Sequence, residues 1–267
     1  MVNKGKFITK GIALVYEDKD LIVVDKPEGL LTVATEREKQ RTVHALLTEY
    51  FRKGCGRSKK RMFVVHRLDR DTSGLVIFAK NEEIMERLKD GWKDNVKKYA
   101  AVVHGLCEKG SGTITSYLAE DSAYTVHSTR DAAKGKLAKT EYRVLKRVKK
   151  YSLLDVTLVT GRKNQIRVHL ASIGHPIVGD TKYGRPDDKQ PRMALHARSI
   201  TFTHPINRKR LSFTSEVPEF FTKLVGRFEL QEKIARKENT MTEVRELENI
   251  KEKWGNGETG KKGLSVC

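Results

Sequence analysis

Cysteine and long apolar segments are scarce in this sequence of 267 residues. Its three cysteines, Cys55, Cys107 and Cys267, lie far apart, so they form neither a disulfide framework nor a CxxC metal-binding pair. The apolar runs, such as residues 74–79, are far shorter than the roughly 20 residues that cross a bilayer. The N-terminus is basic but lacks the apolar stretch and cleavage site of a secretory signal. We therefore expect a cytoplasmic protein, without a membrane segment and without a metal.

Acidic residues are also in the minority. Asp and Glu number 34 and Lys and Arg 53, which gives a formal net charge of +19. Hydrophobic residues make up 38% and aromatic residues 7%, fractions that are typical of a folded protein. A polyanion is thus the first partner to consider, although runs of charge more often form a solvated surface. Two basic clusters stand out: Arg52, Lys53, Arg57, Lys59, Lys60 and Arg61, and Lys146, Arg147, Lys149 and Lys150.

Hydrophobic periodicity predicts more strands than helices. Val- and Ile-rich runs at residues 12–16 and 21–25 flank a turn-like EDKD segment and predict a hairpin. A Thr42 cap predicts a helix up to residue 51, and Asn81 caps a second helix that ends at Gly91. Short turns join most strands, which favours an α+β fold with a largely antiparallel mixed sheet and flanking helices. The other expected elements are strands at 74–80, 98–104, 112–118, 140–145, 151–160, 194–203 and 210–213 and helices at 165–173 and 217–228.

Composition divides the chain into three parts. Residues 1–11 form a basic N-terminal extension, and residues 12–228 form the folded domain. Residues 229–267 change to alternating charges with apolar residues at helical spacing, followed by a Gly- and Lys-rich end. This last part predicts an exposed or loosely docked helix and a disordered tail.

The densest group of polar residues is HRLDRDTSG, at residues 66–74, between two apolar runs. One interpretation is a polar turn whose Asp and Thr side chains cap backbone groups. The other places Asp69 and Asp71 at the mouth of a cleft, where neighbouring arginines favour ionised carboxylates. A carboxylate in that state can act as a nucleophile or a base, so the second interpretation predicts an active site here.

A second polar group, TGRKNQIRVHL, spans residues 160–170. Gly161 stands where a strand is expected to end and a helix to begin, which would leave backbone N–H groups facing an anion. Arg162 and Arg167 add guanidinium groups that can donate two hydrogen bonds to phosphate or carboxylate. The alternative is a basic helix start that is simply solvated. Spacing excludes the kinase catalytic loop, the P-loop and the zinc motif HExxH.

These segments together resemble the RluA family of RNA pseudouridine synthases. The resemblance implies a pseudouridine synthase catalytic domain at residues 12–228, with an active-site cleft across the sheet. It also implies that uridine is isomerised to pseudouridine in structured ribosomal or transfer RNA, without a cofactor. The matching segments are HRLDRDTSG, TGRKNQIRVHL, DKPEGL at 25–30, KYA at 98–100, GHPIVGDTKYG at 174–184 and LHA at 195–197.

The resemblance also implies roles for individual residues. Asp69 corresponds to the family's nucleophile, Tyr99 to a tyrosine that stacks on the uracil and could act as a base, and Arg167 to the arginine that pairs with the aspartate. Because a stacked uracil cannot reach a carboxylate, the nucleotide must be flipped out. Arg67 would fill the vacated space, and Leu158 would form an apolar wall. The other RNA-binding candidates are His66, as a structural partner of the loop, and Arg162, Lys59, Lys60 and Arg61.

The sequence departs from the family pattern in two respects. Many relatives carry His where this chain has Asn164, so a hydrogen bond near the site is expected to differ. The eleven residues before Ile12 are too few for the S4 RNA-binding module that many relatives have. We therefore expect RNA to be captured by the basic surface of the catalytic domain itself. A monomer is expected as the default for this kind of enzyme. The alternative is a non-catalytic RNA-binding protein on the same scaffold, which the presence of Asp69, Tyr99 and Arg167 together argues against.

Overall fold

The computed structural model describes residues 7–9, 11–36, 38–53, 55 and 57–230. One sheet of twelve strands is the main feature of these residues. The strands are β1 (Phe7–Thr9), β2 (Ile12–Glu17), β3 (Leu21–Lys26), β4 (Phe63–Val64), β5 (Ser73–Ala79), β6 (Val96–His104), β7 (Ser111–Glu120), β8 (Val126–Thr129), β9 (Lys136–Val148), β10 (Tyr151–Leu158), β11 (Leu195–Thr203) and β12 (Arg210–Thr214). The helices are α1 (Val43–Arg52), α2 (Glu82–Asp90), α3 (Gln165–Ser172) and α4 (Glu219–Val225), with a 3-10 turn at Trp92–Asp94.

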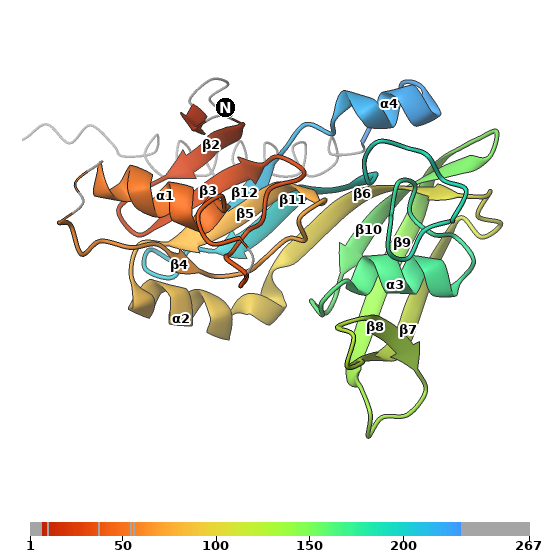
Figure 1. Ribbon diagram of the computed structural model, residues 1–267, viewed down its shortest axis with the longest axis horizontal. Coiled ribbons are helices and arrows are strands. Elements are labelled where there is room, and N and C mark those ends of the chain that lie inside the picture. The colour runs from red at the N-terminus through yellow and green to blue at the C-terminus, as the bar shows by residue number, and fades with distance from the viewer. Residues whose placement is uncertain (1–6, 10, 37, 54, 56, 231–267) are drawn as a thin grey trace, which may run out of the picture. The chain divides into compact units, whose positions relative to one another are not determined.

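The strands follow the order β1-β2-β3-β5-β11-β6-β10-β9-β7-β8, with β12 beside β11 and β4 beside β5 (Figure 1). Only β5 and β11 pair in parallel among these strands; the other pairings are antiparallel. The predicted α+β class with a largely antiparallel sheet is confirmed. No helix among the described residues has the length and apolar character needed to cross a membrane.

Side chains alternate between the two faces of the sheet, and each face carries its own helix. Leu75 and Ile77 of β5 belong to the buried cluster that contains Ile84 of α2. Val76, which lies between them, belongs to the cluster that contains Leu47 of α1. Because successive strand residues point to opposite faces, α1 and α2 cover opposite sides of β5 (Figure 1). Burial on both faces explains why β5 is a continuous apolar run.

The predicted helix starts are confirmed at α1 and α2. The Thr42 side chain accepts a hydrogen bond from the Ala45 N–H, and the Asn81 side chain accepts one from the Ile84 N–H. Each bond satisfies a backbone donor that has no partner within the first helical turn. The helix expected at residues 217–228 is shorter, because α4 begins only after Pro218.

Three strands were not predicted. β1 and β4 are too short to show a periodicity, and β8 contributes only one buried side chain, Val126. β1 pairs with β2, so residues 7–9 belong to the sheet and not to an N-terminal extension. The chain divides into two compact units, Met1–Phe228 and Glu229–Cys267. The helix and tail predicted for the second unit lie, from residue 231 onward, outside the described residues.

The parallel pairing of β5 with β11 requires a glycine. Gly74 pairs with Ala197 and has a φ of 115°, a value that L-residues rarely adopt. A Cβ atom at this position would lie 2.3 Å from the Ala197 carbonyl oxygen. The neighbouring Ser73 hydroxyl forms a 2.9 Å hydrogen bond with Nδ1 of His196. The end of HRLDRDTSG is thus fixed against the LHA segment, more than 100 positions later in the sequence.

A buried lysine fixes the same loop from the other side. Lys26 is fully buried, and its Nζ donates to the carbonyl oxygens of Pro27 at 2.8 Å, Leu30 at 2.7 Å and Arg70 at 2.9 Å. Three acceptors match the three N–H donors of an ammonium group. This side chain therefore joins the DKPEGL segment to the backbone of the HRLDRDTSG loop.

Replacing Lys26 with Met should lower the free energy of unfolding by about 2–4 kcal/mol, because three carbonyl oxygens lose their buried donor. Urea unfolding with an unchanged m-value measures this loss. The matched control is Lys19→Met, the same substitution on an exposed turn, which should change stability by less than about 0.5 kcal/mol. Equal values for the two variants would contradict a structural role for Lys26.

Candidate active site

A cleft of about 650 Å³ lies beside the HRLDRDTSG loop. Its walls come from this loop, from β6, from the end of β10 and from the start of α3. Lys59, Lys60 and Arg61 are exposed and do not line it. The structure does bring together the other predicted site residues, which are His66, Arg67, Asp69, Tyr99, Leu158, Arg162 and Arg167.

Arg167 of α3 binds two carboxylates at once. Its Nε and Nη2 donate to the two oxygens of Asp180 at 2.8 and 2.7 Å, and its Nη1 donates to Asp69 at 3.1 Å. Burial opposes the positive charge, but the two carboxylates outweigh it and raise the pKa of Arg167 above its already high value. Burial likewise opposes the charge of Asp180, and Arg167 outweighs it, so the pKa of Asp180 is lowered. Asp69 is thereby held at the cleft with 30% of its side chain exposed.

Asn164 is a second contact of Asp69, and sequence analysis assigned it no role. It precedes α3 with a φ of 53°, a left-handed conformation that Asn adopts more readily than most residues. The amide orientation that satisfies its neighbours places the nitrogen 3.1 and 2.9 Å from the Asp69 oxygens and lets the amide oxygen accept from the Tyr183 hydroxyl at 3.1 Å. The hydrogen bond expected to differ at Asn164 is therefore one to the candidate nucleophile.

At the start of α3, one backbone N–H group that was expected to face an anion already has a partner within the protein. The Arg162 N–H donates to the side-chain oxygen of Gln165 at 3.0 Å, and the Thr160 hydroxyl donates to the same oxygen at 2.7 Å. The Arg162 Nε donates to the Leu137 carbonyl at 3.2 Å. Gln165, a side chain of the helix itself, satisfies the donor that was expected to face an anion.

The contacts of His66 fit the predicted role of a structural partner of the loop. Its Nε2 accepts a hydrogen bond from the Ile77 N–H at 3.1 Å, and its ring lies 4.7 Å from that of Trp92. Burial, with a smaller contribution from the positive charge of Lys97, lowers the pKa of His66 to about 3, so the ring is neutral. Trp92 and Lys97 line the cleft but were missed. Lys97 could have been predicted from its spacing: it lies two residues before Tyr99 on β6, so the two side chains share a face of the sheet.

Tyr99 lies buried on β6 and forms part of the cleft wall with Leu158. Burial, and to a lesser extent the negative charge of Asp69, raises the pKa of Tyr99 far above its ordinary value. The phenol is therefore neutral, which suits a stacking surface better than a base. Arg67 is exposed at the edge of the same cleft.

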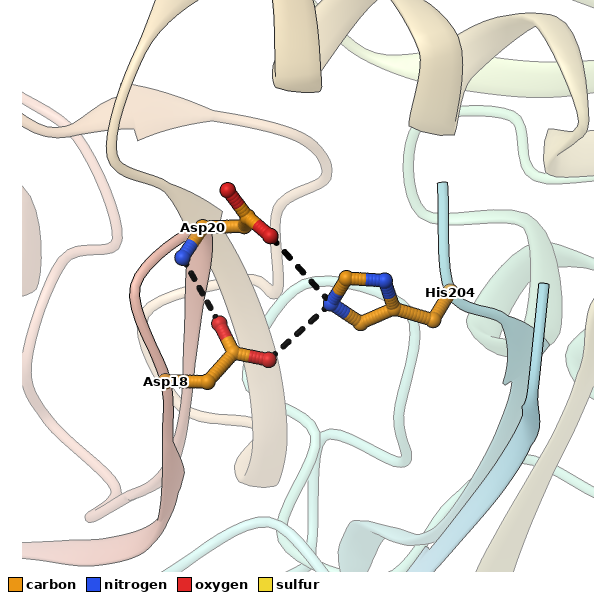
Figure 2. A group of neighbouring side chains, drawn as sticks. All are labelled: Asp18, Asp20 and His204. Carbon is orange, nitrogen blue, oxygen red and sulfur yellow. Dashed lines mark hydrogen bonds and ion pairs between the residues drawn. The ribbon is translucent and has the colours of Figure 1, made fainter. Parts of the chain in front are cut away.

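Outside the cleft, Asp18, Asp20 and His204 form the cluster of possible metal ligands found among the described residues (Figure 2). His204 Nδ1 accepts from the N–H groups of Ile206 and Asn207, so Nε2 carries the proton and donates to Asp18 at 2.9 Å. A metal at Nε2 would have to displace that proton and break this bond. The cluster is better explained as a link between the β2–β3 and β11–β12 turns.

Comparison with known sequences matches residues 20–172 to a family described as RNA pseudouridylate synthase. A Bacillus subtilis protein described as the uncharacterized RNA pseudouridine synthase YlyB is 37% identical over 218 residues, which cover 79% of this chain and 71% of the relative. The dual-specificity RNA pseudouridine synthase RluA of Haemophilus influenzae is 33% identical over 211 residues, which cover 76% and 92%.

Two solved structures have the same fold. Human RNA pseudouridylate synthase domain containing 1 superposes with a TM-score of 0.67 at 24% identity and covers 88% of this chain and 96% of its own. Human RNA pseudouridylate synthase domain containing 4 gives a TM-score of 0.65 at 23% identity, with coverages of 79% and 90%.

Replacing Asp180 with Asn should lower the free energy of unfolding by about 2–4 kcal/mol, because it leaves the buried charge of Arg167 with Asp69 alone. The amide keeps the size of the side chain and can still accept from the Lys182 and Tyr183 N–H groups. Chemical denaturation measures the loss. The control, Asp187→Asn, removes a carboxylate from the exposed ion pair with Arg185 and should not change stability measurably. Equal losses of stability in the two variants would contradict a stabilising role for the buried Arg167–Asp180 pair.

Proposed function

We propose that this chain, which belongs to the RluA family of RNA pseudouridine synthases, uses Asp69 as its nucleophile and modifies ribosomal or transfer RNA without a cofactor. As a member of this family it isomerises uridine to pseudouridine in RNA. The observation that supports Asp69 is its position at the cleft, paired with Arg167 and within reach of Asn164. Asp180 binds the same arginine but is fully buried.

The reaction breaks the bond between N1 of uracil and C1′ of ribose and forms a bond from C5 to C1′. The Asp69 carboxylate can attack C1′ or the uracil ring, and either route gives a covalent intermediate. A carboxylate bound to C1′ is displaced when the C5–C1′ bond forms, whereas one bound to the ring leaves after that bond has formed, when C5 loses its proton and the ring double bond is restored. N1 gains one proton and C5 loses one, so the reaction is an isomerisation. The carboxylate supplies the electron pair, and the balance requires no oxidant or reductant.

The neutral side chains of the cleft suit a uracil ring. Tyr99 and Leu158 offer an aromatic and an aliphatic wall for a flipped uracil. Flipping the nucleotide out of a helix costs a few kcal/mol. The exposed guanidinium of Arg67 can stack on the neighbouring bases and occupy the vacated space, which offsets part of that cost.

The exposed basic surface is proposed to capture the RNA backbone. Lys59, Lys60 and Arg61 project from the segment before β4, outside the cleft. Arg61 lies over the ring of Phe63 at 4.7 Å, and Lys60 over the ring of Phe51 at 5.4 Å, so apolar surface supports both charges. We also propose that the enzyme acts as a monomer.

Asp69→Asn should abolish pseudouridine formation while changing RNA affinity less than about threefold, because the amide keeps the shape but is no nucleophile. Purified enzyme is incubated with ribosomal and transfer RNA that lack pseudouridine, and new pseudouridines are mapped by chemical labelling and sequencing. Asp71→Asn, in the same loop and exposed, is the matched control and should keep the wild-type rate. Product from Asp69→Asn would exclude this nucleophile; no product from the wild type would favour the RNA-binding protein without activity.

The logarithm of RNA affinity should fall linearly with the logarithm of salt concentration. Replacing Lys59, Lys60 and Arg61 with Gln should reduce that slope by about 2, since each lost phosphate contact accounts for roughly 0.7–0.9. A variant with Gln at Lys19, Lys109 and Lys209 removes the same charge from three separate turns. An equal effect of both variants, or no change in slope, would place the Lys59–Arg61 group outside the RNA-binding surface.

A further inference from the structure

The tip of the β7–β8 hairpin presents an exposed tyrosine on a fixed turn. Tyr124 is 74% exposed, the highest value among the exposed large hydrophobic residues of the described chain. Its N–H donates to the Asp121 carbonyl at 3.0 Å, and the Asp121 side chain accepts from the N–H groups of Ala123 and Thr125 at 2.9 and 2.8 Å. Tyr124 has a φ of 58°, a left-handed conformation that costs a tyrosine about 1–2 kcal/mol. The turn thus holds a bulky ring where glycine would fit better.

Two lysines from the active-site side of the domain contact this turn, and one of them lies beside the ring. Lys163 Nζ is 5.6 Å from the ring centroid of Tyr124 and forms an ion pair with Glu120. Lys182 Nζ donates to the Tyr124 carbonyl at 3.0 Å. Both lysines are exposed. An exposed aromatic ring next to exposed lysines matches what a nucleotide offers, a flat base attached to a phosphate.

The turn is connected to the catalytic carboxylate. Lys163 lines the active-site cleft and precedes Asn164, which contacts Asp69. The Tyr183 hydroxyl accepts a hydrogen bond from the Val126 N–H of β8, and the Arg167 guanidinium lies 5.1 Å from the Tyr183 ring centroid. Figure 1 shows the β7–β8 hairpin extending past α3, which carries Arg167. The position of Tyr124 relative to the site is therefore fixed.

We propose that Tyr124 is a stacking platform for a base of the substrate RNA that lies near the flipped uridine, with Lys163 and Lys182 beside its phosphate. This inference rests on the proposed function and adds a recognition element to it. Stacking on an aromatic side chain tolerates any base, so Tyr124 would contribute affinity and position and not read the sequence. It lies on the β7–β8 turn, whereas Arg67 belongs to the HRLDRDTSG loop, so the two residues would hold the RNA through separate elements.

Tyr124→Gly separates this role from a structural one. Glycine relieves the left-handed backbone and removes the ring, so the variant should melt no lower than the wild type. Its Kd for an unmodified ribosomal RNA transcript should nevertheless rise about tenfold, within the range found when one stacking side chain is removed. Tyr124→Phe keeps the ring and should bind within about twofold of the wild type. The matched control, Ile206→Ala, removes an exposed apolar side chain from the β11–β12 turn and should change neither value.

Substrate analogues then identify the contact. In a stem-loop around a uridine that the wild type modifies, one abasic nucleotide at a time is introduced. One position should weaken wild-type binding about tenfold and leave Tyr124→Gly unaffected, because the stacking partner is already missing. At saturating RNA, the rate of pseudouridine formation by Tyr124→Gly should stay within about twofold of the wild-type rate, since Tyr124 does not touch the reacting atoms.

The outcomes distinguish the inference from the proposed function. Equal Kd values for Tyr124→Gly and the wild type would overturn the platform, whether or not the wild type makes pseudouridine. A lower melting temperature together with weaker binding in both Tyr124→Gly and Tyr124→Phe would indicate a structural or protein-binding role and would also overturn it. Failure of the wild type to modify any RNA would instead overturn the proposed function.

Discussion

The site depends on the interaction of Arg167 with two carboxylates, those of Asp69 and Asp180. Asp180 accepts two bonds from the guanidinium and two more from backbone N–H groups, so its oxygens are occupied by structural donors. Asp69 accepts one bond from Arg167 and faces the Asn164 amide, and it keeps part of its surface open to the cleft. The two aspartates share one cation but differ in how many hydrogen bonds their carboxylate oxygens already accept. This difference, and not the arginine alone, supports Asp69 over Asp180 as the proposed nucleophile.

Basic residues serve two separate purposes in this protein. Lys26 and Arg167 are buried and bind carbonyl oxygens or carboxylates, which satisfies the rule that buried charges need partners. Together they hold the HRLDRDTSG loop between the DKPEGL segment and α3. Exposed lysines and arginines, such as Lys59, Lys60 and Arg61, carry positive charge that can attract RNA. A high net charge therefore does not measure the RNA surface, because part of it is used inside the fold.

Local signals predicted most of the fold, whereas long-range hydrogen bonds limited the prediction of the site. Helix caps and alternating apolar residues are local, so α1, α2 and the β2–β3 hairpin followed from a few residues each. β1 and β4 pair through the backbone and carry almost no side-chain signal. Within the site, the segments that resemble a family brought Asp69 and Arg167 together although 98 positions separate them. The contacts of Asn164 and Gln165 depend on side-chain orientation, which no spacing rule encodes.

The proposed function assigns different side chains to the neutral and the charged parts of a nucleotide. His66 and Tyr99 are both neutral because burial disfavours the charged form of each, so these two rings would offer a uracil stacking and van der Waals contact. A phosphate could not enter such a surface without losing its hydration. The exposed Arg67, Lys163 and Lys182 lie where a phosphate stays solvated. The energy needed to flip the nucleotide must then come from contacts with the RNA around the cleft, and an aromatic ring held on a rigid turn provides such a contact with little loss of conformational entropy.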